Sequence, residues 1–479
     1  MKISEEYIEL IAQRVTQRLS QQPKIVSAGA VAHQGGELTD GVFADIDSAV
    51  AAAYIAQRHL VALSMAKRDD IIASIRQTLR DHTEELSRAA LNETGLGRLE
   101  DKIAKNKLVI DKTPGTEDLR PHACSGDRGL TLVEPAPYGV IGAITPITNP
   151  TATIICNSIG MVAAGNSVVF NVHPGARKVS IFNVQLLNRA VVAAGGPANV
   201  ITTVANPTIE SAQELMTHPR VRLLVVTGGE AVVKVAMRSG KRAVCAGPGN
   251  PPAVVDETAD LDKAARDIVL GASFDNNIVC VLEKEIIAAD RIVDDLKRCL
   301  CKHGCVEIGS HQLRPLERVI FQEQFGPGKP AVMNKSYIGK CADVILRQIG
   351  VHVGKEIRMA IVEADRDHPL VLTEQMLPVL PVVRVRNADE GIDLAVKVEH
   401  GFGHTAVMHS KNIDNLSRMA REINCSIFVK NGPSVAGLGY GGEGYTSFSI
   451  ASPTGEGLTS ARSFARERRC VLVDHFRIV

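Results

Sequence analysis

Cys280 is the residue in this chain whose setting best suits a nucleophile. It ends the loop SFDNNIVC, where the loop meets a predicted strand over 281–289, and it follows two side-chain amides, Asn276 and Asn277. A thiol at the edge of a strand can face a crevice between domains and attack a carbonyl carbon there. Ten cysteines occur in the 479 residues. Most cysteines in a chain of this length are inert core residues, so position alone leaves the other nine as competitors.

A second short motif suits the binding of phosphate. Thr227, Gly228 and Gly229 directly follow a predicted strand over 222–226, and the motif TGGE (227–230) opens a predicted helix over 229–239. Free backbone N–H groups and the helix dipole attract an anion at such a place. We therefore predict that the motif faces the ligand crevice.

Two other patterns resemble known sites but lack the required context. Gly439-x-Gly441-x-x-Gly444 has the spacing of a dinucleotide-binding loop, but it does not join a strand to a helix. We expect it to line a ligand rather than to hold the cofactor. Cys299, Cys301, His303 and Cys305 are two apart at a predicted helix end. Since zinc fingers prefer C-x₂₋₄-C pairs in loops, we predict no metal site.

The middle of the chain alternates strands with helices. Four predicted helices separate five predicted strands, which are 139–145, 167–172, 199–204, 222–226 and 242–246. This alternation predicts a parallel, doubly wound sheet, and such sheets bind ligands at the carboxyl ends of their strands.

A second unit of the same kind begins near residue 252. Its predicted strands include 281–289 and segments near 357–363, 379–386, 405–409 and 426–430. The fold class is therefore α/β with two doubly wound domains. The predicted boundaries are a cofactor-binding domain over 43–245 with a bridging arm at 121–137, a catalytic domain over 246–449, and a bridging segment over 450–479. The segment 432–458 is a long loop, either ordered or mobile. The terminal strand in RRCVLVDHFRIV lacks a local partner and is expected to dock elsewhere, for instance on a neighbouring subunit.

The first residues are expected to be separate from the catalytic body. Apolar residues recur at three- and four-residue steps over 1–19, which predicts an amphipathic helix. Residues 20–42 contain SQQP, SAGA and HQGG and are predicted to be a flexible linker. A tethered helix with an apolar face favours docking on another protein. The alternative is a helix that packs on its own domain.

Composition excludes several classes of function. The formal net charge is +1, 4% of the residues are aromatic, and there is no Trp. Such a chain has neither the positive field nor the stacking surface of a nucleic-acid binder. The longest apolar region, 151–172, carries Asn157, Ser158, Asn166 and Ser167 and would be a poor membrane span. The acidic start argues against a secretory signal, so we expect a cytosolic chain with reduced thiols.

Several motifs in order then resemble a known family. SFDNNIVC, TPITNPTATIICNSI, CAGPGNPP, TEQMLPVLPVVRV, EHGFGHTA, INCSIFVKNGPS and PTGEGLTSARSFARERRCVLVD are similar to segments of the coenzyme-A-acylating aldehyde dehydrogenases of bacterial microcompartments. The resemblance runs from about residue 40 to 479, and it implies an aldehyde-dehydrogenase-like fold. The N-terminal helix and linker resemble the encapsulation tag of that family, which implies binding to shell proteins through residues 1–19 and a location in the microcompartment lumen. It also implies a homo-oligomer, either a dimer or a tetramer.

The resemblance assigns roles to individual residues. Cys280 falls at the nucleophile of the family. TPITNP (145–150) matches the segment whose amide stabilises the oxyanion, which implies that role for Asn149 beside the Cys280 backbone N–H. Glu374 falls on the carboxylate that holds the nicotinamide ribose. The cofactor-contacting residues that it implies are Thr145, Pro146, His173, Pro174, Thr227, Gly228 and Gly229.

Two departures from the hydrolytic branch of the superfamily are informative. Cys245 stands where those enzymes carry the Glu that activates water, so the acyl-enzyme should persist until the coenzyme A thiolate arrives. Ala176, in His173-Pro174-Gly175-Ala176, stands where they carry a Glu that anchors the ribose, so NADP is possible beside NAD.

These features imply a reaction and its competitors. The Cys280 thiolate adds to propionaldehyde or acetaldehyde, hydride leaves for the nicotinamide, and coenzyme A accepts the acyl group from the resulting thioester. One alternative is a CoA-independent aldehyde dehydrogenase, and another is a non-catalytic adaptor of the microcompartment. The choice of aldehyde, the oligomeric state and the upstream pathway stay open.

Overall fold

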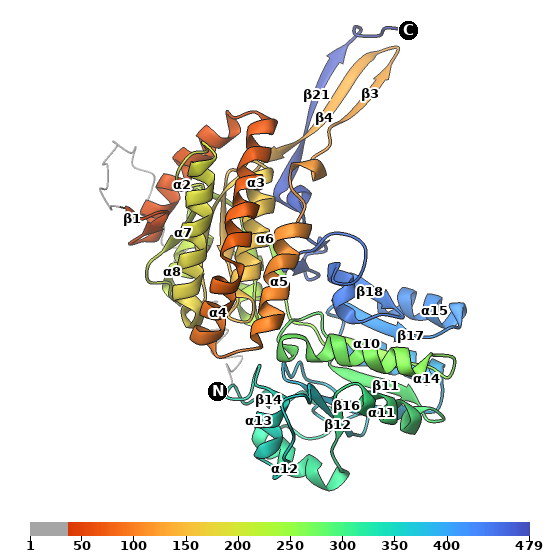
Figure 1. Ribbon diagram of the computed structural model, residues 1–479. Helices are drawn as coiled ribbons and strands as arrows, with labels where there is room; N and C mark the ends of the chain where they lie inside the picture. The colour runs from red at the N-terminus through yellow and green to blue at the C-terminus, as the bar shows by residue number, and fades with distance from the viewer. Residues whose placement is uncertain (1–36) are drawn as a thin grey trace.

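Two seven-stranded sheets and a projecting arm make up the protein (Figure 1). The computed structural model describes residues 37–479. The predicted helix over 1–19 and most of the predicted linker lie outside the described residues.

The first sheet has the predicted strands in the order β7-β6-β5-β8-β9. They are β5 (Val140–Ile144), β6 (Ser167–Asn171), β7 (Ile201–Val204), β8 (Val221–Thr227) and β9 (Arg242–Ala246). All of their pairings are parallel, which confirms the doubly wound prediction. From β5 the chain moves outward through β6 and β7, and β8 and β9 then extend the other side. The order therefore reverses beside β5, and a crevice is expected at the carboxyl ends there.

The predicted linker over 20–42 extends too far, because its last residues belong to the first sheet. β1 (Glu37–Thr39) and β2 (Val42–Phe43) form a hairpin, and β2 extends the sheet in parallel with β7. Gly41, at φ +87°, allows the tight turn. The side chains of Val42 and Phe43 are buried, so the catalytic body begins before residue 43.

Helices cover both faces of this sheet (Figure 1). They are α2 (Ile46–Val61), α3 (Met65–Asp81), α4 (Thr83–Thr94), α5 (Leu99–Lys112), α6 (Pro150–Ala163), α7 (Arg177–Ala193), α8 (Ile209–Thr217) and α9 (Glu230–Met237). α3 and α4 are separate helices, because the backbone leaves the helical region at His82. Every residue of α6 is buried, which explains why its sequence is apolar on all sides.

The second sheet is parallel throughout and has the order β12-β15-β16-β11-β10-β17-β18. Its strands are β10 (Pro252–Val255), β11 (Glu285–Ala289), β12 (Cys305–Glu307), β15 (Met359–Glu363), β16 (Val379–Val385), β17 (Thr405–His409) and β18 (Ile427–Lys430). Its helices are α10 (Leu261–Ser273), α11 (Val293–Lys302), α12 (Ser310–Ile320), α13 (Ala342–Arg347), α14 (Ala388–Val398) and α15 (Ile413–Ile423). The predicted strand over 281–289 begins four residues late, because the backbone is not in strand conformation until Glu285. Two short ribbons, β13 (Phe321–Glu323) with β14 (Val332–Met333) and β19 (Ile450–Ala451) with β20 (Gly457–Leu458), complete the strands.

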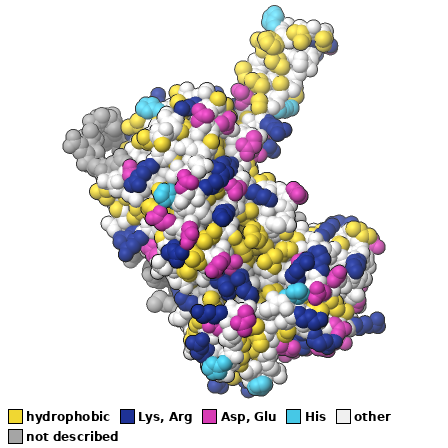
Figure 2. Space-filling view, in the orientation of Figure 1, with side chains coloured by type: hydrophobic (Ala, Val, Ile, Leu, Met, Phe, Trp, Pro, Cys, Tyr) yellow, Lys and Arg dark blue, Asp and Glu magenta, His cyan; other side chains and the backbone are white. Residues whose placement is uncertain are grey.

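The arm is a three-stranded antiparallel sheet that extends away from both domains (Figure 1). It consists of β3 (His122–Gly126), β4 (Gly129–Pro137) and β21 (Ala465–Val473). The terminal strand was expected to dock elsewhere, for instance on a neighbouring subunit, and it pairs with the distant strand β4 of its own chain along nine residues. Figure 2 shows many apolar side chains on this arm, and Val471, Leu472 and Val473 are exposed.

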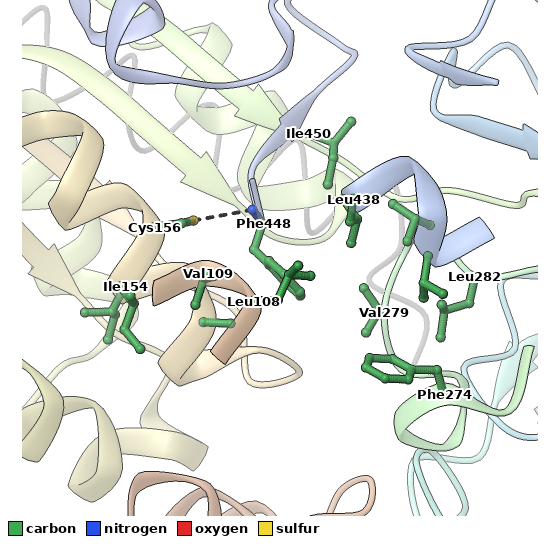
Figure 3. Packing of buried hydrophobic residues seen from close by; sticks show 14 of the residues in the cluster. Leu108, Val109, Ile154, Cys156, Phe274, Val279, Leu282, Leu438, Phe448 and Ile450 are labelled. Atoms are coloured by element: carbon green, nitrogen blue, oxygen red, sulfur yellow. Dashed lines mark hydrogen bonds between the residues drawn. The ribbon is translucent and has the colours of Figure 1, made fainter. Parts of the chain in front are cut away.

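One hydrophobic core runs through both domains. Figure 3 shows residues of α5 and α6, such as Leu108 and Ile154, near Phe448 and Ile450, with Val279 and Leu282 of the second domain beyond them. The backbone N–H of Phe448 donates to Cys156 Sγ at 3.4 Å. The segment 432–458 is thus an ordered connection that packs against both domains, with one 3₁₀ turn at Ser434–Leu438.

Candidate active site

All ten residues predicted for the site line a single cavity of about 640 Å³. They are Thr145, Pro146, Asn149, His173, Pro174, Thr227, Gly228, Gly229, Cys280 and Glu374. The first eight come from the carboxyl ends of strands of the first sheet, as the doubly wound order predicts. Cys280 and Glu374 come from the second domain. The cavity therefore lies between the domains.

One end of the cavity suits a pyrophosphate and an adenosine. Gly229 is the N-cap of α9, and a Cβ built on it would meet no atom within 4 Å, so the backbone there is open to a ligand. The hydroxyl oxygen of Thr145 is buried and has no hydrogen-bond partner among the described residues. Both observations fit a dinucleotide with polar groups at this end.

The α8 and α9 side of the cavity was missed from the sequence. Its residues are Thr208, Ile209, Ala212, Gln213, Met216, Ala231, Val232 and Val235. Apolar side chains on these two helices form a slot suited to a flat ring. The signal in the sequence was only that both helices flank the strand before TGGE.

His173 and Pro174 line the neighbouring part of the cavity, but Ala176 does not. Ala176 is fully buried at the start of α7. Glu374 is the single carboxylate among the residues that line the cavity. Burial lowers the pKa of His173, and Lys335 adds to the effect. This part of the cavity therefore presents no negative charge to a ribose phosphate.

The loop before Cys280 has an unusual backbone. Asp275, Asn276 and Asn277 all have positive φ, at 46°, 53° and 67°. Asp and Asn are the residues other than Gly that enter this region most readily. The Asn276 amide donates to the Gly339 carbonyl at 2.8 Å, and the Asn277 amide donates to the carbonyls of Ala272 and Glu283 at 2.7 and 2.9 Å. These amides hold the loop in place, so they are not free donors to a substrate.

The Cys280 loop packs closely against the backbone at Gly249. A Cβ built on Gly249 would lie 2.9 Å from the Cys280 carbonyl oxygen and 2.9 Å from the His404 ring. Only glycine fits there without a shift of this packing. His404 is buried, its Nδ1 contacts the Thr405 hydroxyl at 2.9 Å, and burial lowers its pKa to about 4.

The charges around Cys280 determine how easily it ionises. Burial raises the pKa of the thiol to about 12, the Glu374 carboxylate adds to this, and the Lys284 ammonium opposes it. Lys284 is fully buried and donates to the Asn277 carbonyl at 2.9 Å and to the Asn277 side chain at 2.5 Å. Burial lowers the pKa of Lys284 to about 8. Lys284 was missed from the sequence because nothing in the motif NNIVCVLEK shows that its side chain turns inward.

Cys245 does not occupy the place expected for it. It is absent from the lining of the cavity and packs in a hydrophobic cluster with Leu224, Val226 and Val233. Burial raises the pKa of its thiol to about 11. Gly247 and Pro248 line the cavity instead, because the chain turns inward only after β9 ends at Ala246.

The remaining patterns lie elsewhere. Gly439 and Gly442 offer their carbonyls to the Lys112 ammonium, at 2.6 and 3.0 Å, and none of the glycines over 437–444 lines the cavity. This glycine run therefore does not line the cavity that holds Cys280. Within residues 37–479, no three His, Cys, Asp or Glu side chains are grouped as metal ligands, and no helix is both long and apolar enough to cross a membrane.

The fold and the cavity define a two-domain α/β enzyme with a cysteine and a dinucleotide cleft facing each other. The family model "Aldehyde dehydrogenase family" matches residues 27–458, and the chain belongs to that family.

Its relatives include the acylating branch that the motifs resemble. The chain is 53% identical over 440 residues to an acetaldehyde dehydrogenase (acetylating) of Escherichia coli, covering 92% of this chain and 94% of the relative. It is 46% identical to a propanal dehydrogenase (CoA-propanoylating) of Salmonella typhimurium, covering 91% and 93%. It also matches the crystal structure of a Rhodopseudomonas palustris propionaldehyde dehydrogenase with bound CoA and an acylated cysteine. That match has a TM-score of 0.88 and 52% identity, and it covers 91% of this chain and 99% of the other. The resemblance found in the sequence is confirmed.

Proposed function

We propose that this chain oxidises a short-chain aldehyde, propionaldehyde or acetaldehyde, to the corresponding acyl-CoA. NAD is the electron acceptor, NADP is a possible substitute, and coenzyme A is the acyl acceptor. The observation that carries the proposal is the cavity itself, which brings Cys280, Asn149, Glu374 and the TGG turn together between two domains.

The residues of the cavity divide into two groups by role. Thr227, Gly228 and Gly229 would hold the pyrophosphate at the start of α9, with Thr145 and Pro146 beside it. His173 and Pro174 would contact the adenosine ribose, and Glu374 the nicotinamide ribose. A bound nicotinamide supplies the acceptor for the hydride of the aldehyde.

The second group acts on the aldehyde. The Cys280 sulfur attacks the carbonyl carbon, and the carbonyl electrons move to the oxygen. The Asn149 side-chain N–H and the Cys280 backbone N–H donate to that oxygen, which stabilises it where the charge develops. Loss of hydride leaves a thioester on Cys280. The coenzyme A thiolate then attacks the thioester and releases Cys280.

The lack of a free general base in the cavity favours transfer of the acyl group to coenzyme A over its hydrolysis. Hydrolysis needs a general base close to the thioester. Cys245 lies outside the cavity, and Glu374, its single carboxylate, would be occupied by the ribose.

The assembly and location follow from parts outside the cavity. We propose that residues 1–19 bind shell proteins of a bacterial microcompartment and bring the enzyme into its lumen within the cytoplasm. The exposed apolar arm supports a homo-oligomer, either a dimer or a tetramer, because such a surface is usually covered.

One assay tests the function. NADH formation from propionaldehyde and NAD is followed with and without coenzyme A, and propionyl-CoA is measured directly. The proposal requires steady turnover and propionyl-CoA only when coenzyme A is present, and loss of both in Cys280→Ala. Steady release of free acid without coenzyme A would favour a CoA-independent dehydrogenase. No turnover under either condition would favour the adaptor.

A further inference from the structure

A buried cluster of charged residues lies directly behind the cavity. Lys102 and Lys105, on successive turns of α5, both form ion pairs with Asp275, the Lys102 pair at 3.2 Å. The exposed fraction of each of these three side chains is 4% or less. Asp275 belongs to the Cys280 loop and also accepts from the Arg98 backbone N–H at 2.7 Å. Buried charges of this kind are retained only when they are paired.

One member of the cluster contacts a residue that lines the cavity. The Lys105 ammonium donates to the side-chain oxygen of Asn149 at 2.6 Å. An ammonium can only donate, so it fixes which end of the Asn149 amide faces it. The NH₂ end must therefore point the other way, where one of its hydrogens reaches the Thr148 hydroxyl at 3.3 Å.

The same cluster is tied to the nucleophile. Asp275 lies five residues before Cys280 on the same loop, and its backbone N–H donates to the Asp101 carboxylate at 2.9 Å. A Cβ on Gly97 would overlap the Asp275 carboxylate, so α5 begins as close to this loop as backbone allows. Asp275 therefore links the loop that carries Cys280 to the lysine that holds Asn149.

We propose that Lys105 is a positioning residue that orients and polarises the Asn149 amide toward the oxyanion formed on Cys280. This inference rests on the proposed function, in which Asn149 is the oxyanion donor. Lys105 itself transfers no proton and touches no substrate. When the Cys280 sulfur bonds to the aldehyde carbon, the carbonyl electron pair moves to oxygen, and an amide N–H already held in place donates to it. Burial lowers the pKa of Lys105 to about 8 while Asp275 opposes the shift, which is why the ion pair is needed to keep it charged.

The test is the rate of the first turnover, measured as the burst of NADH after mixing enzyme, NAD and aldehyde. Removal of one oxyanion donor slows an enzyme by about 10²–10³-fold, so Lys105→Met should slow the burst by about ten- to a hundredfold. The NADH dissociation constant and the aldehyde KM should change by less than about threefold, because Lys105 lines neither binding region.

A double-mutant cycle separates positioning from general destabilisation. If Lys105 acts through Asn149, adding Lys105→Met to Asn149→Ala should slow the burst no further. A full second loss in the double variant would overturn the proposal. So would an unchanged burst in Lys105→Met.

Lys102→Met is the matched control, because Lys102 pairs with the same carboxylate but has no hydrogen bond to Asn149. It should melt at a temperature similar to that of Lys105→Met while keeping a burst rate within about threefold of the parent. An equal loss of burst rate in both variants would show that the cluster acts only through packing and would overturn the proposal.

Two variants cover the case in which Lys105→Met does not fold. Lys105→Arg keeps a cation with several N–H donors and should be faster than any neutral replacement. Asn149→Asp keeps a partner for Lys105 but has no N–H to donate, so it should fold and yet be as slow as Asn149→Ala. If Asn149→Ala and Asn149→Asp both keep the parent burst rate, the oxyanion role of Asn149 is wrong and the proposal falls with it. Acyl-CoA formation by the same variants once coenzyme A is added would show that the acylating function still stands.

Discussion

Cys280 is a poor thiolate in the protein alone, because burial and the nearby Glu374 carboxylate both oppose its ionisation. The buried Lys284 ammonium is the group that favours the thiolate. A buried ammonium also lies beside Asn149, where Lys105 supplies a fixed positive charge. Each of the two groups proposed to act on the aldehyde thus has a buried lysine nearby. Each lysine acts on a neighbour instead of on the substrate.

The position of Cys245 yields a prediction that differs from the one based on the motif alone. Because Cys245 stands where hydrolytic enzymes carry their Glu, the motif alone predicts that Cys245→Glu would supply a base for hydrolysis, but residue 245 packs in a hydrophobic cluster. A carboxylate buried there without a partner costs several kcal/mol, so the melting temperature should fall by several degrees. Release of free propionate without coenzyme A should not increase, whereas Cys245→Ala should melt closer to the parent. Faster release of acid from a stable Cys245→Glu protein would show that the side chain reaches the thioester.

At the scale of single elements, the turn after β6 determines the choice of cofactor. Since no carboxylate lines the cavity near His173 and Pro174, nothing there repels a 2′-phosphate. We expect NAD to be preferred, with NADP used at a kcat/KM lower by as little as about tenfold, or about 1.4 kcal/mol. Steady-state rates with each cofactor measure this ratio. The absence of any turnover with NADP would mean that another group guards the 2′ position.

Removal of the N-terminal segment, residues 1–19, is expected to leave catalysis intact. The described catalytic body begins with β1, at Glu37, so removal of residues 1–19 should leave kcat and KM in solution within about twofold. The same residues fused to a fluorescent protein should direct it into a microcompartment. Loss of activity on deletion would instead show that the segment packs on the catalytic body.

These elements also show what a sequence can and cannot reveal. Most of the parallel strands of both sheets, β2 and β12 excepted, were predictable because buried strands are short apolar runs separated by helices. The hairpin of β1 and β2 was missed because its strands are only three and two residues long. The pairing of β21 with β4 joins segments more than 300 residues apart, which no local pattern encodes.

At the site, motifs placed residues but not side-chain directions. Cys280 and Gly229 were found because a loop–strand junction and a helix start have local signals. Lys105 and Lys284 were missed because a buried lysine resembles a surface lysine until the fold is known. Cys245 was misplaced for the same reason, since neighbouring residues of a strand point to opposite faces.

At the scale of the whole molecule, the two domains share one hydrophobic core, so they should unfold together.

The stability of the protein should also fall in acid. Burial lowers the pKa of His409 to about 4, with Asp267 opposing and Lys263 adding to the shift. In the unfolded chain a histidine titrates near 6.5, so the unfolded state binds more protons between these values. The stabilisation from neutral His409 is complete above pH 6.5 and is lost as the pH falls toward 4.

His409→Leu tests this expectation, because it removes the titrating group from a buried strand position. The free energy of unfolding should fall with a slope shallower by up to about 1.4 kcal/mol per pH unit between pH 6.5 and 4. His404, which is buried in the same way, keeps part of the dependence in the variant. Parallel slopes in parent and variant would show that His409 is not held neutral.

The central claim, that a thioester on Cys280 waits for coenzyme A, is tested most directly by mass spectrometry of the enzyme after reaction with propionaldehyde and NAD alone. The account predicts one burst of NADH per active site, one propionyl group on the peptide that contains Cys280, and loss of that group as propionyl-CoA when coenzyme A is added. Continued turnover without coenzyme A, or a propionyl group on any other cysteine, would contradict it.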